Sequence, residues 1–174
     1  MIRNRRLALG LGLACAVVAL DQLSKWWIVE HVMNPPRVIP VAPFFNLVMG
    51  WNRGVSFGLF SSDSSAAAWA LIVLALLIVG LLIAWLAKEE HAPTAAALGL
   101  VIGGALGNVI DRLRFGAVAD FLDFHAFGYH WPAFNAADTA ISLGALALVA
   151  GALFARPDLH KNKESGDSGE RPGT

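Results

Sequence analysis

The sequence predicts an all-α integral membrane protein with four transmembrane helices, accompanied by a small sheet at the outer membrane face. Three observations predict this fold class. Apolar residues make up 56% of the 174 residues. Residues 7–155 contain only 15 of the 26 charged side chains, or about one residue in ten, whereas soluble domains carry about one in four. Four stretches are apolar enough to cross a bilayer, which takes about 20 residues of helix.

The four predicted helices cover residues 7–27, 67–87, 92–112 and 137–155. The second contains 21 residues without a charge. The first has 14 uncharged residues before Asp21, so it reaches spanning length only if Asp21 and Lys25 lie near the far interface. We take residues 1–155 as one membrane-embedded domain and the polar residues 156–174 as a disordered cytoplasmic tail.

The first apolar stretch has an alternative interpretation as a secretory signal peptide, because Ala14 and Cys15 resemble a lipoprotein processing site. However, the apolar run continues for five residues past Cys15, and Gly12 stands where such a site has leucine. These features favour an uncleaved helix, in which we expect Cys15 to be a buried apolar residue. A single cysteine also excludes an internal disulfide.

The distribution of basic residues predicts that both termini are cytoplasmic. In that orientation the outer side receives Arg37, Arg53 and Arg114. The inner side receives a larger set of eight basic residues: Arg3, Arg5, Arg6, Lys88, Arg156, Lys161, Lys163 and Arg171.

Two long segments connect the predicted helices on the outer side. Residues 37–60 contain three strand-like runs, at 38–41, 44–48 and 55–60, which Pro and Gly separate. This pattern predicts the small sheet. We expect residues 114–136 to form an outer loop, and Asp63 and Asp123 to be solvated.

Ionisable side chains are costly in a bilayer, so each one in or beside a predicted helix calls for a reason. The polar residues of three helices fall at their outer ends: Asp21 and Lys25 on the first, Asn108, Asp111 and Arg112 on the third, and Asn135 and Asp138 on the fourth. Spacings of three or four residues place each group on one face of its helix. The cluster is either a reactive site or a set of interhelical contacts that hold the bundle together.

Two local features help to bring these polar groups together. Gly99, Gly103 and Gly107 recur every fourth residue, and this small-residue stripe predicts the close approach of another helix. Asn135 is expected to cap the fourth helix, with Asp138 in the first turn.

Carboxylates are the reactive groups that this cluster offers. The sequence contains no HExxH or GxSxG motif, and its five histidines lack metal-ligand spacing, so we expect neither a metal nor a cofactor. Two close carboxylates share a proton and can divide general-base and general-acid roles around one water. The residues alone leave the pair open among Asp111, Asp120, Asp123 and Asp138, with Asp21 as a further candidate. A formal net charge of zero gives no basic field for nucleic acid.

Five motifs resemble those of the lipoprotein signal peptidases, or signal peptidase II. They are DQLSK at 21–25, NRGVSFG at 52–58, GGALGNVIDR at 103–112, VADF at 118–121 and FNAAD at 134–138. The resemblance extends from about residue 10 to residue 155 and leaves out the charged tail.

The resemblance implies a bacterial membrane aspartic endopeptidase that cuts prolipoproteins before a cysteine carrying diacylglycerol. The family's catalytic aspartates correspond to Asp120 and Asp138. By the same resemblance, the substrate-binding or supporting residues are Asp21, Lys25, Asn52, Arg53, Gly54, Asn108, Asp111, Arg112 and Asn135. We interpret Asp111 and Arg112 as a structural pair that braces the site.

The resemblance also implies an extracytoplasmic β-cradle and a short, partly helical loop over the site. The expected partners are the diacylglyceryl-modified prolipoprotein and membrane lipids. We expect a monomer in the bacterial cell (inner) membrane, with the active site near the extracytoplasmic face. From the residues alone, a small transporter or proton-relay bundle and a purely structural membrane protein remain alternatives.

Overall fold

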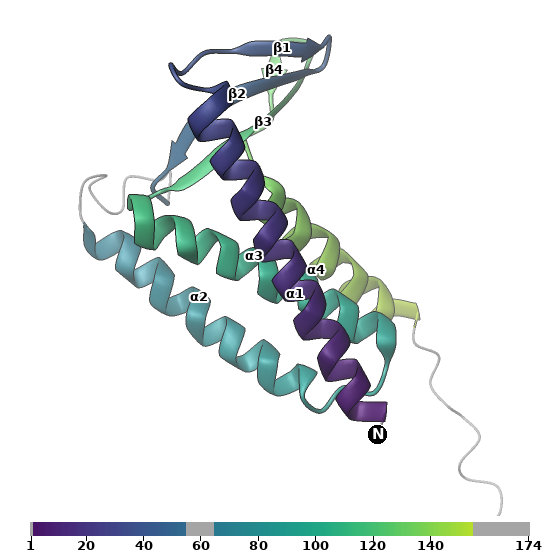
Figure 1. Cartoon of the computed structure of the whole chain (residues 1–174). Coiled ribbons are helices and arrows are strands. Elements are labelled where there is room, and N and C mark those ends of the chain that lie inside the picture. The colour runs from purple at the N-terminus through teal and green to yellow at the C-terminus, as the bar shows by residue number, and fades with distance from the viewer. Residues whose placement is uncertain (1, 55–64, 155–174) are drawn as a thin grey trace, which may run out of the picture.

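A computed structural model describes residues 2–54 and 65–154 of the chain. Its four long helices are α1 (Ile2–Trp27), α2 (Ser65–Leu86), α3 (Ala92–Phe115) and α4 (Ala136–Phe154), shown in Figure 1. All four are long and apolar enough to span a membrane. The prediction of four transmembrane helices is therefore confirmed, although α1 begins at Ile2 and includes the three N-terminal arginines.

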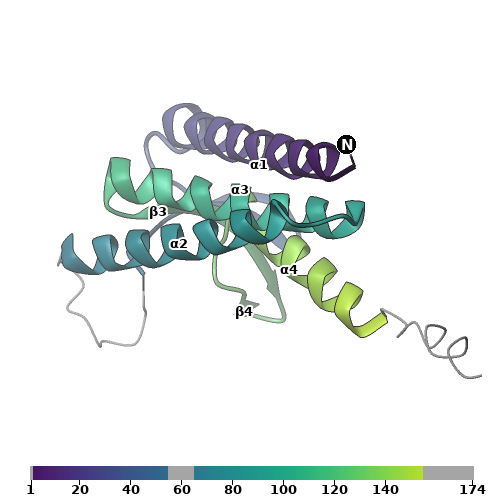
Figure 2. The ribbon, with the colours of Figure 1, turned by 90° about the horizontal axis from the view of Figure 1, so that it is seen from below.

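Helix α3 occupies the centre of the bundle, where it packs against α1, α2 and α4 (Figure 2). Its glycine stripe explains the close approach. A Cβ at Gly99 would collide with the backbone of Gly10 on α1, and a Cβ at Gly103 would lie 2.7 Å from the carbonyl oxygen of Ala14. Gly104 faces the backbone of Ala137 on α4 in the same way. The predicted packing role of the stripe is confirmed.

An antiparallel sheet lies at the end of the bundle opposite the N-terminus (Figure 1). Its strands are β1 (Ile39–Ala42), β2 (Phe45–Asn52), β3 (Val118–Ala126) and β4 (Tyr129–His130), in the order β1-β2-β3-β4. The first two predicted runs, at 38–41 and 44–48, correspond to β1 and β2. The run at 55–60 lies outside the described residues. The expected outer loop at 114–136 instead supplies β3 and β4.

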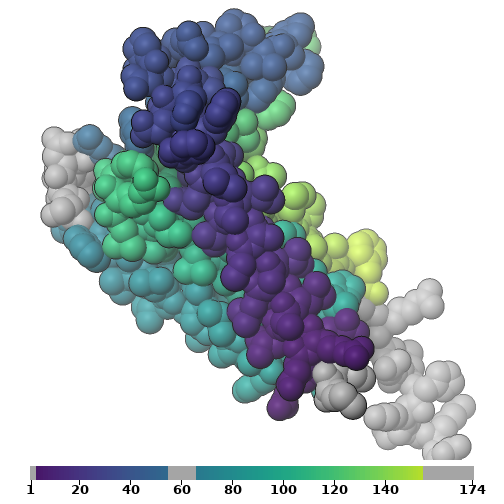
Figure 3. Space-filling model, viewed as in Figure 1, coloured from purple at the N-terminus to yellow at the C-terminus, as the bar shows by residue number. Residues whose placement is uncertain are grey.

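The sheet is joined to the helices through covalent continuity and an apolar contact. A π-helical turn, η1 (Ile28–Val32), directly follows α1. Ile28 and Met33 then pack against Phe121 of β3 in a buried cluster. At the other end of β3, Phe127 and Gly128 form a two-residue turn with positive φ angles of 52° and 81°, the geometry of a tight β-hairpin. In the space-filling view the sheet forms a cap on the elongated bundle (Figure 3).

One expectation about α1 is wrong. Cys15 is exposed on the surface of the helix rather than buried. The neighbouring Ala14 occupies the contact with α3 instead, because successive residues of a helix point in different directions.

The glycine contact between α1 and α3 leads to a stability prediction. We expect Gly99→Ala to destabilise the protein by about 1 to 3 kcal/mol, because the added methyl group overpacks the interface. Gly12→Ala is the matched control, since a Cβ at Gly12 of α1 meets nothing within 4 Å. Thermal unfolding in detergent micelles measures the difference. Equal melting temperatures for the two variants would contradict the packing role of Gly99.

Candidate active site

A buried ammonium group is the centre of the polar cluster. The Nζ atom of Lys25 lies 2.9 Å from Oδ2 of Asp21, 2.9 Å from Oδ2 of Asp111 and 3.1 Å from Oδ1 of Asn108. Lys25 donates hydrogen bonds to Asp21 and Asn108 and forms an ion pair with Asp111. Asp21 and Asp111 are completely buried. The predicted i, i+4 pair of Asp21 and Lys25 is therefore present, and Asp111 completes a buried triad.

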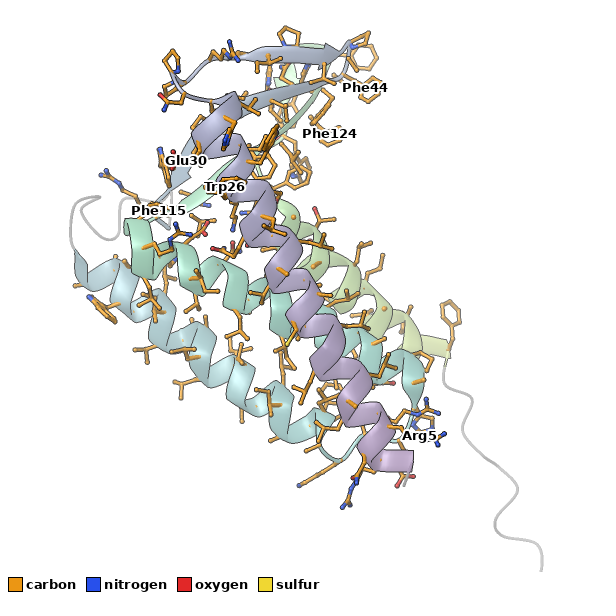
Figure 4. The ribbon with its side chains drawn as sticks, viewed as in Figure 1. Arg5, Trp26, Glu30, Phe44, Phe115 and Phe124 are labelled. Carbon is orange, nitrogen blue, oxygen red and sulfur yellow. The ribbon has the colours of Figure 1, made fainter. Side chains whose placement is uncertain are left out.

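The two carboxylates of this triad also hold neighbouring backbone. Oδ1 of Asp21 accepts the N–H of Ala137, in the first turn of α4, at 3.0 Å. Oδ2 of Asp111 accepts the N–H of Ala119 on β3 at 3.1 Å. The triad therefore connects α1 and α3 to the start of α4 and to β3. Figure 4 shows polar side chains between α1 and α3 near the helix ends that Trp26 and Phe115 mark.

Gln22 belongs to the same network, and the sequence reasoning did not identify it as a site residue. Its Nε2 atom donates to Oδ1 of Asp111 at 2.9 Å and to Oδ2 of Asp21 at 3.1 Å. Its Oε1 atom lies 3.4 Å from Nη1 of Arg114. The available signal was its place in the DQLSK motif, directly beside Asp21.

Asn108 connects the triad to Asp138. Because Oδ1 of Asn108 accepts from Lys25, its Nδ2 group points away from the ammonium and donates to Oδ1 of Asp138 at 2.8 Å. The lysine thereby fixes the orientation of the amide. Asp138 is half-buried in the first turn of α4.

Asn135 contacts both candidate catalytic aspartates. Its Oδ1 atom accepts the N–H of Asp138 at 3.0 Å, which confirms the predicted N-cap. In return, Oδ2 of Asp138 accepts the N–H of Asn135 at 3.2 Å. The remaining amide group, Nδ2, donates to Oδ1 of Asp120 at 2.7 Å. One fully buried side chain therefore joins the start of α4 to β3.

Asp120 lies on β3 and is 3% exposed. Burial raises the pKa of Asp120 to about 6, and the nearby charge of Asp138 acts in the same direction. Hydrogen bonds from Asn52 and Asn135 oppose this increase without cancelling it. The carboxyl group consequently retains its proton up to a pH at which an ordinary aspartate is ionised.

The remaining predicted residues lie around this pair. Asn52 ends β2, and its Oδ1 atom accepts the N–H of Gly54 in a tight turn at 2.9 Å. Gly54 has a φ of 87°, which favours glycine. Arg53 is exposed between them. Arg112 is near enough to interact electrostatically with the carboxylates of Asp138, Asp120 and Asp111.

Asp111 braces the site through contacts with Lys25, Gln22 and the backbone of Ala119, and Arg112 interacts with it electrostatically. One expectation about these carboxylates is wrong. Asp123 is buried rather than solvated, with an exposed fraction of 6%.

The contacts of Asp123 explain why it stays outside the candidate pair. Asn46 donates to it at 3.0 Å and Nδ1 of His130 lies 2.9 Å away. Burial alone would raise the pKa of Asp123, but these hydrogen bonds lower it. Asp63 lies outside the described residues.

The arrangement offers two carboxyl groups in different surroundings on either side of Asn135. Such a pair supports general acid–base chemistry on a water molecule. Among the described residues, no group of three His, Cys, Asp or Glu side chains has the geometry to hold a metal ion.

Comparisons with known proteins identify the family of the chain. Residues 13–154 match the profile of the family described as signal peptidase (SPase) II. A lipoprotein signal peptidase from Methylobacterium sp. (strain 4-46) is 38% identical, over 97% of this chain and 98% of the relative. One from Azoarcus sp. (strain BH72) is 50% identical, over 76% of this chain and 75% of the relative.

The fold is also similar to a solved bacterial membrane enzyme. The two structures superpose with a TM-score of 0.72 and 29% sequence identity, over 91% of this chain and 94% of the other. With four membrane-spanning helices, the chain is a multi-pass membrane peptidase, and it belongs to the signal peptidase II family.

Proposed function

We propose that this protein is an aspartic endopeptidase that removes signal peptides from diacylglyceryl-modified prolipoproteins, by cleaving before the lipidated cysteine. Its membership of the lipoprotein signal peptidases supports the removal of signal peptides from prolipoproteins. The observation that carries the aspartic mechanism is the position of Asp120 and Asp138, which both hydrogen-bond to Asn135.

The different surroundings of the two aspartates suggest their roles. Asp120 is buried, and its pKa, raised to about 6, lets it keep a proton up to a higher pH than an ordinary aspartate does. Asp138 accepts N–H groups from Asn108 and Asn135 and lies in the first turn of α4, where the helix dipole favours a negative charge. We therefore assign Asp138 as the general base and Asp120 as the general acid.

The proposed reaction needs one water molecule between the two carboxyl groups. Asp138 takes a proton from this water as it attacks the scissile carbonyl, and Asp120 donates its proton to the carbonyl oxygen. The tetrahedral intermediate then collapses, and the proton held by Asp138 passes to the leaving amine. As the carbonyl re-forms, one hydroxyl group of the intermediate returns its proton to Asp120, so both aspartates regain their starting states without a covalent intermediate.

The other motif residues position this pair and the substrate. Lys25 and Asp111 set the orientation of Asn108, as described above. The turn that contains Asn52, Arg53 and Gly54 presents polar groups beside Asp120, where a substrate backbone would pass. The acyl chains of the substrate remain in the bilayer, so their binding energy orients the peptide at the interface.

The proposed orientation places both termini in the cytoplasm and the site near the extracytoplasmic face, following the basic residues near the helix ends. We further propose that the monomer is the active form. A proton-relay bundle would place ionisable groups through the depth of the membrane. The helical segments 7–20, 66–86, 92–110 and 139–154 contain none, which favours a peptidase with its site at one interface.

Loss of either aspartate tests the proposed pair. We expect Asp120→Asn and Asp138→Asn each to lower the cleavage rate of a diacylglyceryl-modified prolipoprotein by about a hundredfold to ten-thousandfold, the range for general acid–base groups. The measurement is a single-turnover assay with purified protein. Asp123→Asn, on the same strand as Asp120 but outside the network, should cleave at a rate close to that of the wild type. Rapid cleavage by either variant of the pair would refute the assignment.

Removing the lipid from the substrate tests the proposed specificity. We expect an unlipidated precursor to show a lower kcat/KM, because the peptide loses the binding energy of its two acyl chains. Matched precursors with and without diacylglycerol, compared in the same micelles, provide the measurement. If kcat/KM is equal for both, lipid recognition is not part of the mechanism.

The pH dependence of cleavage tests the shared proton. Below about pH 6 the raised pKa keeps Asp120 protonated, so kcat/KM should fall as the pH rises through the upper apparent pKa of the pair. It should fall again at low pH, where the pair gains its second proton. We expect a bell-shaped profile whose two limbs belong to the pair as a unit. A profile with a single limb, over the pH range in which the protein stays folded, would contradict one shared proton.

A further inference from the structure

The projecting end of the sheet has two chemically different faces. Side chains of a strand alternate between faces, and directly opposite residues of neighbouring strands share one. Asn46 is paired with Asp123, and His125 with His130, so one face is polar. Phe45 is paired with Phe124, and Ala126 with Tyr129, so the other face is apolar and aromatic.

Contacts within each face agree with this register. On the polar face, Asp123 binds the side chains of Asn46 and His130, and the rings of His125 and His130 stack at 4.8 Å. On the aromatic face, the ring of Phe124 lies 4.8 Å from that of Phe45. The sheet is therefore amphipathic over this end.

The position of Asp120 shows which way the aromatic face points. Asp120 and Phe124 are four residues apart on β3, so their side chains lie on the same face. Asp120 points to Asn135, the cap of α4, at 2.7 Å. Phe124 stacks on Phe134, which directly precedes that cap, at 5.8 Å and an interplanar angle of 15°. The aromatic face is thus directed to the side on which α4 begins.

The aromatic face extends beyond the helices that lie next to Asp120. In Figure 2, β4 projects past the bundle on the side away from α1. Figure 4 shows Phe44 and Phe124 near this end of the sheet. Phe124 is 42% exposed, Tyr129 is 67% exposed, and Phe127 at the tip of the hairpin is fully exposed.

We propose that this aromatic face lies on the lipid bilayer, in the interfacial layer beside α4, while the opposite face, on which His130 is exposed, points away from the acyl chains. The four helices are long and apolar enough to cross a bilayer, which would surround the bundle, including the side on which α4 begins. Trp, Tyr and Phe side chains favour this interfacial layer, and an amphipathic element binds there with its apolar face toward the acyl chains.

The proposal gives a reason for two unusual features of the hairpin. A phenylalanine side chain that is fully exposed to water contributes no burial energy, whereas Phe127 would bury its ring by inserting between lipid headgroups. It also occupies a position with positive φ, where Asn or Gly is the common choice. The contact of the aromatic face with the bilayer would fix the height of Asp120 above the membrane, because Asp120 and Phe124 lie on the same strand.

Two neighbouring positions on β4 form a matched test. Cys15 is the single cysteine, so a Cys15→Ser background allows one nitroxide label to be attached at Tyr129→Cys or at His130→Cys. The protein is placed in vesicles of equal parts of phosphatidylethanolamine and phosphatidylglycerol. Power saturation then compares collisions of the label with oxygen, which concentrates in the bilayer, and with a water-soluble nickel chelate.

We expect the ratio of oxygen to nickel accessibility to be high at residue 129 and low at residue 130, a reversal over one residue. A third label at Phe127→Cys, where the native ring is fully exposed, should behave like residue 129. Because residue 127 lies outside β4, this label also gives a reading that does not depend on a substitution within that strand. Prolipoprotein cleavage by each labelled variant checks that the enzyme remains folded.

Two outcomes would overturn the proposal. Strong nickel accessibility at residues 127 and 129 would place the aromatic face in water. Protection of both residues from oxygen as well as from nickel would indicate a protein contact, such as a second copy of the chain, in place of lipid. Neither outcome would alter the assignment of Asp120 and Asp138, which depends on the cleavage assays alone.

Discussion

The buried ammonium of Lys25 is the interaction on which the rest of the site depends. Burying a charge is costly unless partners replace the lost water. Here Asp21 and Asn108 accept hydrogen bonds from the ammonium, and Asp111 forms a second ion pair with it. The two carboxylates in turn bind backbone N–H groups of α4 and β3. One small network therefore fixes the relative positions of α1, α3, α4 and the sheet, where lipid contacts alone would give little specificity.

Two asparagines convert this fixed geometry into an asymmetric pair of carboxyl groups. An amide has a donor end and an acceptor end, so fixing one end determines the direction of the other. Lys25 orients Asn108 toward Asp138, and the cap of α4 orients Asn135 toward Asp120. The strand buries Asp120 while the helix terminus leaves Asp138 half-buried. The different environments, more than the residue types, distinguish two otherwise identical side chains.

The sequence was sufficient to predict the four helices and to predict that their polar residues lie at the same end of the bundle. Apolar runs of spanning length leave few alternatives, since backbone groups in lipid must be satisfied within a helix. It was less informative for the sheet, because β3 pairs with a strand about 70 residues earlier in the chain, and such long-range pairing has no local signal. The wrong expectation for Asp123 has the same origin, because its hydrogen bond with Asn46 joins two strands that are distant in sequence.

By itself, the sequence determined that this is a four-helix membrane protein whose scarce polar residues gather at one end, and its motifs indicated the family. Hydropathy is a local property of the sequence, and it is enough to identify these helices because an apolar segment that crosses a bilayer must satisfy its own backbone hydrogen bonds. Only the tertiary structure decided that Lys25 of α1 contacts Asp111 of α3, and that Asn135 contacts both Asp120 and Asp138. Those contacts join elements distant in sequence, and the direction of each side chain is set by packing between helices and sheet.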